Sequence, residues 1–74
     1  MIPDAERYVA AVEVVRGGII LRYLLKADGS YTPIDDKSNP ALFGTYEAAR
    51  QASHRLRDRF EKGARPFVKE YGKL

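Results

Sequence analysis

Few side chains in this sequence have types and spacing that could support catalysis. There is no Cys and only one His, so disulfides, thiolate catalysis, Cys-ligated zinc and multi-His metal sites are excluded. A general base needs a partner group and a pocket. His54 is instead surrounded by Arg50, Gln51 and Arg55 on a predicted helix. We therefore interpret His54 as an exposed side chain without a catalytic role.

A loop around two adjacent carboxylates is the next candidate. Asp35, Asp36, Ser38 and Asn39 offer the oxygen ligands that hard cations bind. The segment lacks the glycine and the distal glutamate of an EF-hand loop, so we interpret it as a turn. Gly17-Gly18 is too short for a nucleotide-binding loop and joins two predicted strands. The sequence thus predicts a protein that is not an enzyme, with no cofactor, no metal and no evident small-molecule substrate.

Positive charge is concentrated in the C-terminal part. Residues 1–44 contain five Lys and Arg and six acidic residues, a net charge of −1. Residues 45–74 contain eight Lys and Arg and four acidic residues, a net charge of +4. Arginine suits phosphate, so one hypothesis is a nucleic-acid-binding accessory domain. Against it, Glu47, Asp58 and Glu61 lie among the basic residues. The residues that would bind are Arg50, Arg55, Arg57, Arg59, Lys62 and Arg65.

Two glycine-containing turns define the elements that would position these side chains. Gly17-Gly18 and Asp28-Gly29 are typical two-residue hairpin turns, which predicts strands at about 7–15, 19–26 and 31–35. A helix is the rival for residues 7–15. With both turns in place, Arg22 lies opposite Glu13 on one side and Asp35 on the other, and such pairs are mildly favourable. Pro33 suits an outer strand.

A helix is predicted from about Tyr46 to Lys62. Thr45 is a typical N-cap residue, and Gly63 a plausible stop. A stripe at spacings of three and four would pack on the sheet: Ala49, Ala52, Leu56 and Phe60. The tail 64–74 is too apolar to assume disorder and would form a short helical turn or lie back on the sheet. The predicted fold class is α+β: one small domain, residues 1–74, with a three-stranded antiparallel β-meander against one long C-terminal helix.

The sheet face away from the helix is predicted to be more apolar than a solvated face. Three occupants could cover it: the tail through Phe67 and Tyr71, a second copy in a homodimer, or a different protein. The leading functional hypothesis is a small protein-interaction module that self-associates through this outer face. The residues expected to carry that contact are Val15, Ile20, Leu24 and Tyr31.

The helix opening Phe43-Gly44-Thr45-Tyr46-Glu47-Ala48-Ala49 after a three-stranded meander resembles the arm-binding domain of phage-type integrases. The resemblance spans about residues 7–60 and implies a sheet that enters the DNA major groove. The sequence departs from that family where function would lie. The DNA-reading face is basic in the family, whereas Glu13 and Asp35 here offset Arg22 and Lys26.

Residues 1–6 lack the positive start and apolar run of a secretory signal. The most apolar stretch, residues 18–25, is interrupted by Arg22 and is shorter than the ~20 residues that a spanning helix needs. We therefore expect a cytoplasmic protein with no membrane association.

Overall fold

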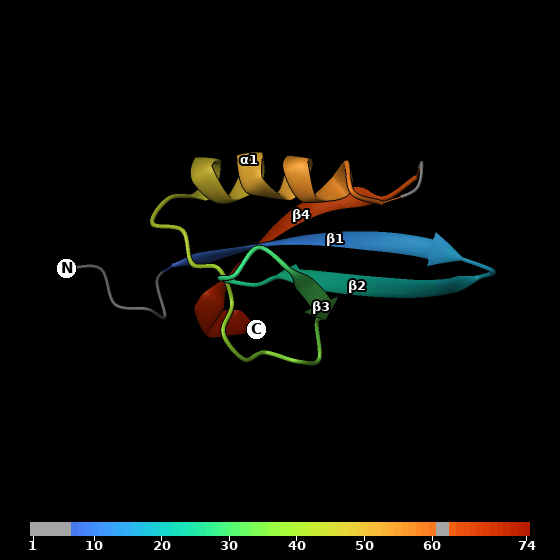
Figure 1. The fold of residues 1–74 in the computed structure, drawn as a ribbon, viewed down its shortest axis with the longest axis horizontal. Helices are drawn as coiled ribbons and strands as arrows, with labels where there is room; N and C mark the ends of the chain where they lie inside the picture. The colour runs from blue at the N-terminus through green and yellow to red at the C-terminus, as the bar shows by residue number, and fades with distance from the viewer. Residues whose placement is uncertain (1–6, 61–62) are drawn as a thin grey trace.

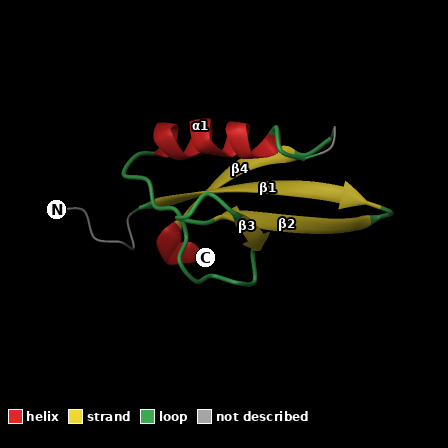
Figure 2. Cartoon of the chain, in the orientation of Figure 1, coloured by secondary structure: helices red, strands yellow, loops and turns green. Residues whose placement is uncertain are grey.

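An antiparallel sheet with one helix on one of its faces forms the fold (Figures 1 and 2). The computed structural model describes residues 7–60 and 63–74. The sheet has the order β3-β2-β1-β4. The elements are β1 (Tyr8–Arg16), β2 (Ile19–Leu25), β3 (Tyr31–Pro33), α1 (Tyr46–Arg57), β4 (Arg65–Glu70) and the short 3₁₀ turn η2 (Tyr71–Lys73). The α+β class is confirmed, whereas the expectation of three strands is wrong because the sheet has four, and α1 is not long, at 12 residues.

The first hairpin forms as the sequence predicts. Residues 8–16 are a strand, which decides against the rival helix. Gly17 and Gly18 both have positive φ, 58° and 79°, the region that this turn requires and that glycine adopts without steric cost. Glu13 pairs with Arg22 in the ladder, as expected.

The second hairpin differs from the prediction by one residue. Its loop has three residues rather than two: the Gly29 amide donates to the Lys26 carbonyl at 3.0 Å, and Gly29 has φ 89°. The Asp28 carboxylate accepts from the Ser30 amide and hydroxyl, which stabilises this longer turn. Tyr23 therefore pairs with Pro33. The predicted pairing of Arg22 with Asp35 is wrong, since a one-residue slip moves every side chain of β3 to the other face.

Helix α1 begins where the sequence predicts. Thr45 is the N-cap, and its Oγ1 accepts from the Ala48 amide at 3.2 Å. Ala49, Ala52 and Leu56 are buried against the sheet. The helix ends at Arg57, and the predicted end at Lys62 lies outside the described residues. Phe60, the fourth residue of the predicted helix stripe, lies beyond α1 and packs on the rings of Tyr23 and Tyr31, with centroids 5.2 and 4.6 Å away.

The tail supplies the fourth strand. β4 pairs with β1, with Phe67 opposite Ala11 and Arg65 opposite Glu13. Pro66 is tolerated here because β4 is an edge strand. Residues 65–70 thus extend the sheet sideways, which neither sequence-based alternative included, whereas residues 71–73 form the short helical turn that one alternative predicted.

The loop between β3 and α1 crosses one end of the sheet. The Ala41 amide donates to the Leu25 carbonyl at 3.0 Å, and the Phe43 amide donates to the Tyr8 carbonyl at 2.8 Å. This loop and η2 lie on the side of the sheet opposite α1 (Figure 1). At this end Val9, Ala11 and Leu24 on the outer face are completely buried. The outer face therefore has a covered end and, at the β1–β2 turn, an open end.

Candidate interaction site

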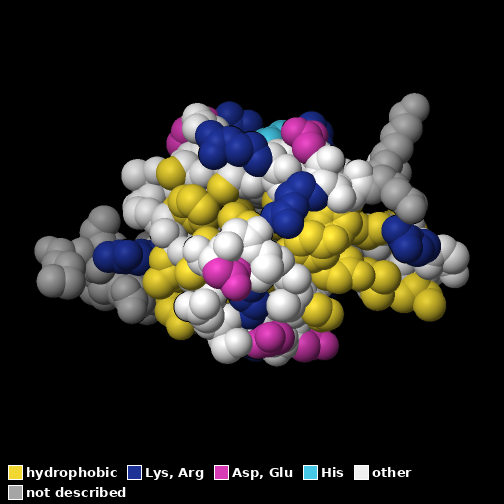
Figure 3. Space-filling view, viewed as in Figure 1, with side chains coloured by type: hydrophobic (Ala, Val, Ile, Leu, Met, Phe, Trp, Pro, Cys, Tyr) yellow, Lys and Arg dark blue, Asp and Glu magenta, His cyan; other side chains and the backbone are white. Residues whose placement is uncertain are grey.

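The tip of the β1–β2 hairpin, residues 15–21, exposes large apolar side chains on both of its faces. Val15 and Ile20 pair across the two strands on the outer face and are 59% and 56% exposed. Ile19 and Leu21 lie on the opposite face and are 62% and 36% exposed. Figure 3 shows hydrophobic side chains gathered over this end of the molecule. We call residues 15–21 the hairpin tip.

Neither edge of the hairpin tip has a neighbouring strand within the described part of the chain. β4 begins opposite Glu13 and so stops short of Val15. On the other side β3 pairs only with Tyr23, Leu24 and Leu25. Unpaired backbone groups on an exposed edge are a template for another strand. On its β2 side, at Ile20, the tip therefore combines apolar surface with an edge that no described strand pairs.

Two of the four residues predicted for the outer-face contact are not exposed on that face. Val15 and Ile20 are exposed on the outer face, as expected. Leu24 is 0% exposed, so it belongs to the core and its expected exposure is wrong. Tyr31 lies on the helix side, where its ring packs edge-on to Tyr23 at a centroid distance of 5.6 Å. The shifted register of the second hairpin places Tyr31 there, because it exchanges the two faces of β3.

The basic residues predicted to bind nucleic acid are not brought together on one surface. Arg50 donates to both oxygens of Glu47, at 2.7 and 3.0 Å, and these hydrogen bonds lower the pKa of the Glu47 carboxyl and raise the pKa of Arg50. Arg57 lies 3.5 Å from Asp58. Arg59 bonds the Gly29 carbonyl and lies over the ring of Tyr31.

The remaining members of that set are separated from the helix or from each other. Arg65 lies on β4 opposite Glu13, on the outer face of the sheet. Arg55 is exposed on α1, and Lys62 lies outside the described residues. The described arginines thus divide between the two sides of the sheet, and two of those on α1 or at its end are neutralised by carboxylates.

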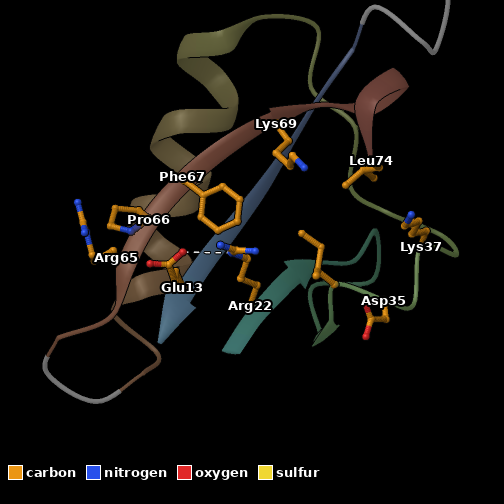
Figure 4. A pocket seen from close by; sticks show the side chains of 10 residues that line it. Glu13, Arg22, Asp35, Lys37, Arg65, Pro66, Phe67, Lys69 and Leu74 are labelled. Carbon is orange, nitrogen blue, oxygen red and sulfur yellow. Dashed lines mark hydrogen bonds and ion pairs between the residues drawn. The ribbon is translucent and has the colours of Figure 1, made fainter. Parts of the chain in front are cut away.

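A groove that the sequence analysis missed lies on the outer face beside β4. It has a volume of about 610 Å³ and combines basic and apolar side chains (Figure 4). Arg65, Phe67 and Lys69 alternate along β4 and would have indicated a common face had residues 65–70 been predicted as a strand. The full lining is Glu13, Arg22, Ile34, Asp35, Lys37, Arg65, Pro66, Phe67, Lys69 and Leu74.

The catalytic and metal-ligating candidates have ordinary structural surroundings. Nε2 of His54 lies 3.5 Å from Nη1 of Arg50. The Asp36 carboxylate accepts from the Ser38 amide at 3.1 Å and the Ser38 hydroxyl at 2.6 Å, which lowers the pKa of Asp36. Within residues 7–60 and 63–74, no group of three His, Cys, Asp or Glu side chains is placed to hold a metal ion.

Comparisons with protein-family models, with curated proteins and with solved structures found no match to this chain. The likeness to integrase arm-binding domains therefore stays a resemblance in sequence. Among the described helices, none has the length and apolar character needed to span a bilayer.

Proposed function

We propose that this chain is a small, non-enzymatic protein-interaction module that self-associates through the hairpin tip. One observation carries the proposal: the tip exposes Val15, Ile19 and Ile20 by more than half, and no strand among the described residues pairs with the β2 edge at Ile20. Protein surfaces that combine apolar side chains with a free strand edge pair readily with another strand. Of the four contact residues expected from the sequence, the proposal keeps Val15 and Ile20. It adds Ile19 and Leu21, which lie on the other face of the hairpin tip.

The free edge of β2 favours a second copy as the partner. The Arg22 carbonyl accepts from the Ile34 amide, so it points toward the β3 side. Because backbone groups alternate along a strand, the amide and carbonyl of Ile20 point the same way, into the unpaired space. Two β2 strands related by a two-fold axis at Ile20 would exchange two hydrogen bonds there. The contact is self-complementary, as a two-fold dimer requires.

The side chains at this edge do not oppose such pairing. Natural sheets protect free edges with Lys, Pro or bulges. Residues 19–21 are Ile-Ile-Leu and have none of these. Pairing would also bring the two copies of Ile20 and Val15 together on one face.

Sedimentation velocity over a range of concentrations tests the proposal. We expect the wild-type chain to reach twice its 8.4 kDa mass and Ile20→Lys to remain at 8.4 kDa, because a buried lysine would have no partner. The control is Tyr46→Lys, a similar loss of exposed apolar surface at the start of α1, which should still dimerise. Circular dichroism confirms that each variant is folded. A wild-type chain that stays at 8.4 kDa throughout overturns the proposal.

Nucleic-acid binding through the basic helix is the alternative function. The charges of Arg50 and Arg57 are offset by Glu47 and Asp58, which weakens its support. If it holds, binding of a fluorescent oligonucleotide should fall steeply with salt, and Arg55→Ala with Arg59→Ala should weaken it further. Absence of binding at low salt would contradict this alternative and leave the self-association proposal intact.

A further inference from the structure

The groove on the outer face has the size and construction of a ligand site. Its volume of about 610 Å³ lies within the roughly 300–1,000 Å³ typical of small-molecule sites. Its walls come from segments far apart in the sequence: β1 and β2, the loop after β3, β4, and the residue after η2. It is separate from the hairpin tip, since none of residues 15–21 lines it.

The groove carries a small excess of positive charge. Its basic side chains are Arg22, Lys37, Arg65 and Lys69, and its acidic ones are Glu13 and Asp35. The net charge of the lining side chains is therefore +2. Arg22 Nε donates to Glu13 at 3.1 Å, which holds the guanidinium at the groove. Within the described residues, Lys37, Arg65 and Lys69 form no ion pair. Lys37 and Lys69, together with the Nη atoms of Arg22 that the Glu13 contact leaves free, are therefore available to an incoming anion.

An aromatic ring lies beside these cations. Figure 4 shows the Phe67 ring flanked by Lys69 and Arg22, with Leu74 and Lys37 across the open space. Phe67 is half-buried, so one part of its ring packs against the sheet and another part is exposed to the groove. Ile34 and Pro66 extend the apolar lining. Basic groups and an apolar ring surface thus face the same space.

We propose that this groove binds a small anion that carries an apolar ring, with the anionic group between Lys69, Arg22 and Lys37 and the ring against Phe67. The excess of two charges and the carboxylates of Glu13 and Asp35 match a ligand with one or two negative charges and disfavour a polyanion. Binding along a single strand of nucleic acid uses successive stacking rings, whereas this groove offers one. Phosphate and carboxylate share the chemistry that the cations recognise.

A nitrogen-15 NMR titration with phenyl phosphate tests the proposal. We expect saturable shifts at the amides of Arg22, Lys37 and residues 65–69. Benzoate shows whether a carboxylate serves as well as a phosphate, while inorganic phosphate and benzyl alcohol each lack one half of the ligand. Both of these should bind more weakly than phenyl phosphate. Equal affinity for phenyl phosphate and inorganic phosphate, or shifts that do not saturate, overturns the proposal.

Charge-neutralising variants locate the site. The double variant Lys37→Gln, Lys69→Gln should weaken phenyl phosphate binding about three- to tenfold, the range expected for losing two partly exposed cation contacts. Lys73→Gln is the control, because Lys73 is exposed, lies 3.5 Å from Glu70 and does not line the groove. An equal loss in both variants would show non-specific attraction and overturn the proposal. The monomeric Ile20→Lys variant should bind normally, so failure of either proposal is recognisable separately.

Discussion

At the scale of single residues, Lys26 has the least expected environment. Its side chain is 6% exposed, and its ammonium donates to the carbonyls of Asp36 and Ser38 and lies 3.4 Å from the Asp36 carboxylate. A buried ammonium is tolerated only when its donors are satisfied, and here the loop after β3 wraps around it. Lys26 therefore fastens that loop over the core at Leu24.

Replacing Lys26 by methionine tests this role. Lys26→Met keeps the length of the side chain but leaves two carbonyls without their donor, so we expect a loss of about 1–3 kcal/mol in the free energy of unfolding. Urea denaturation measures it. Lys37→Met on the same loop is exposed and should change stability by less than about 0.5 kcal/mol. Unchanged stability in Lys26→Met would show that the loop does not depend on this contact.

Three surface carboxylates give the stability a defined dependence on pH. Hydrogen bonds from Ser30, Ser38 and Arg50 lower the pKa of Asp28, Asp36 and Glu47 below their ordinary values of 3.8, 3.8 and 4.5. A lowered pKa in the folded state means that the ionised form is favoured by folding. The resulting stabilisation is present above the ordinary pKa and is lost as the pH falls below it.

We therefore expect the melting temperature to fall as the pH drops below about 4.5, the higher of these ordinary values. At neutral pH the triple variant Asp28→Asn, Asp36→Asn, Glu47→Gln should have a lower melting temperature than wild type. In acid the two melting temperatures should become similar. Thermal denaturation followed by circular dichroism measures both. A difference between the two proteins that stays constant across the range would contradict this assignment.

At the scale of elements, what the sequence predicted correctly depends on local signals. The Gly17-Gly18 turn, the pairing of Glu13 with Arg22 and the Thr45 cap each follow from two to four adjacent residues. The second register failed because Asp-Gly is compatible with two loop lengths. The hydrogen bonds of the Asp28 carboxylate with Ser30 favour the longer loop.

Longer-range features were not predictable in the same way. Residues 65–70 are a strand only because β1 offers an edge more than 50 positions earlier, and their sequence includes a proline and three charges. Without β4 there is no groove, since Arg65, Phe67 and Lys69 share a face only as a strand. Burial of Leu24 likewise depends on the loop after β3, whose path cannot be predicted from a periodic sequence pattern. The candidate site was thus half predicted, through Val15 and Ile20.

At the scale of the whole molecule, one half of the outer sheet face is buried and the other half is exposed. Leu24 and Ile20 lie four residues apart on the same face of β2, yet Leu24 is completely buried and Ile20 is 56% exposed. The loop after β3 and η2 cover the first half, and the second half extends beyond them. The surplus of apolar side chains therefore serves partly as core and partly as surface.

Paired alanine substitutions test this division. Leu24→Ala should lower the free energy of unfolding by about 2–5 kcal/mol, the usual range for truncating a buried leucine. Ile20→Ala should change it by less than about 0.5 kcal/mol when urea denaturation is done at concentrations at which both variants sediment as monomers. At high concentration Ile20→Ala should weaken dimerisation. If both variants instead lose the same free energy of unfolding as monomers, the hairpin tip belongs to the core and its apolar residues need no partner.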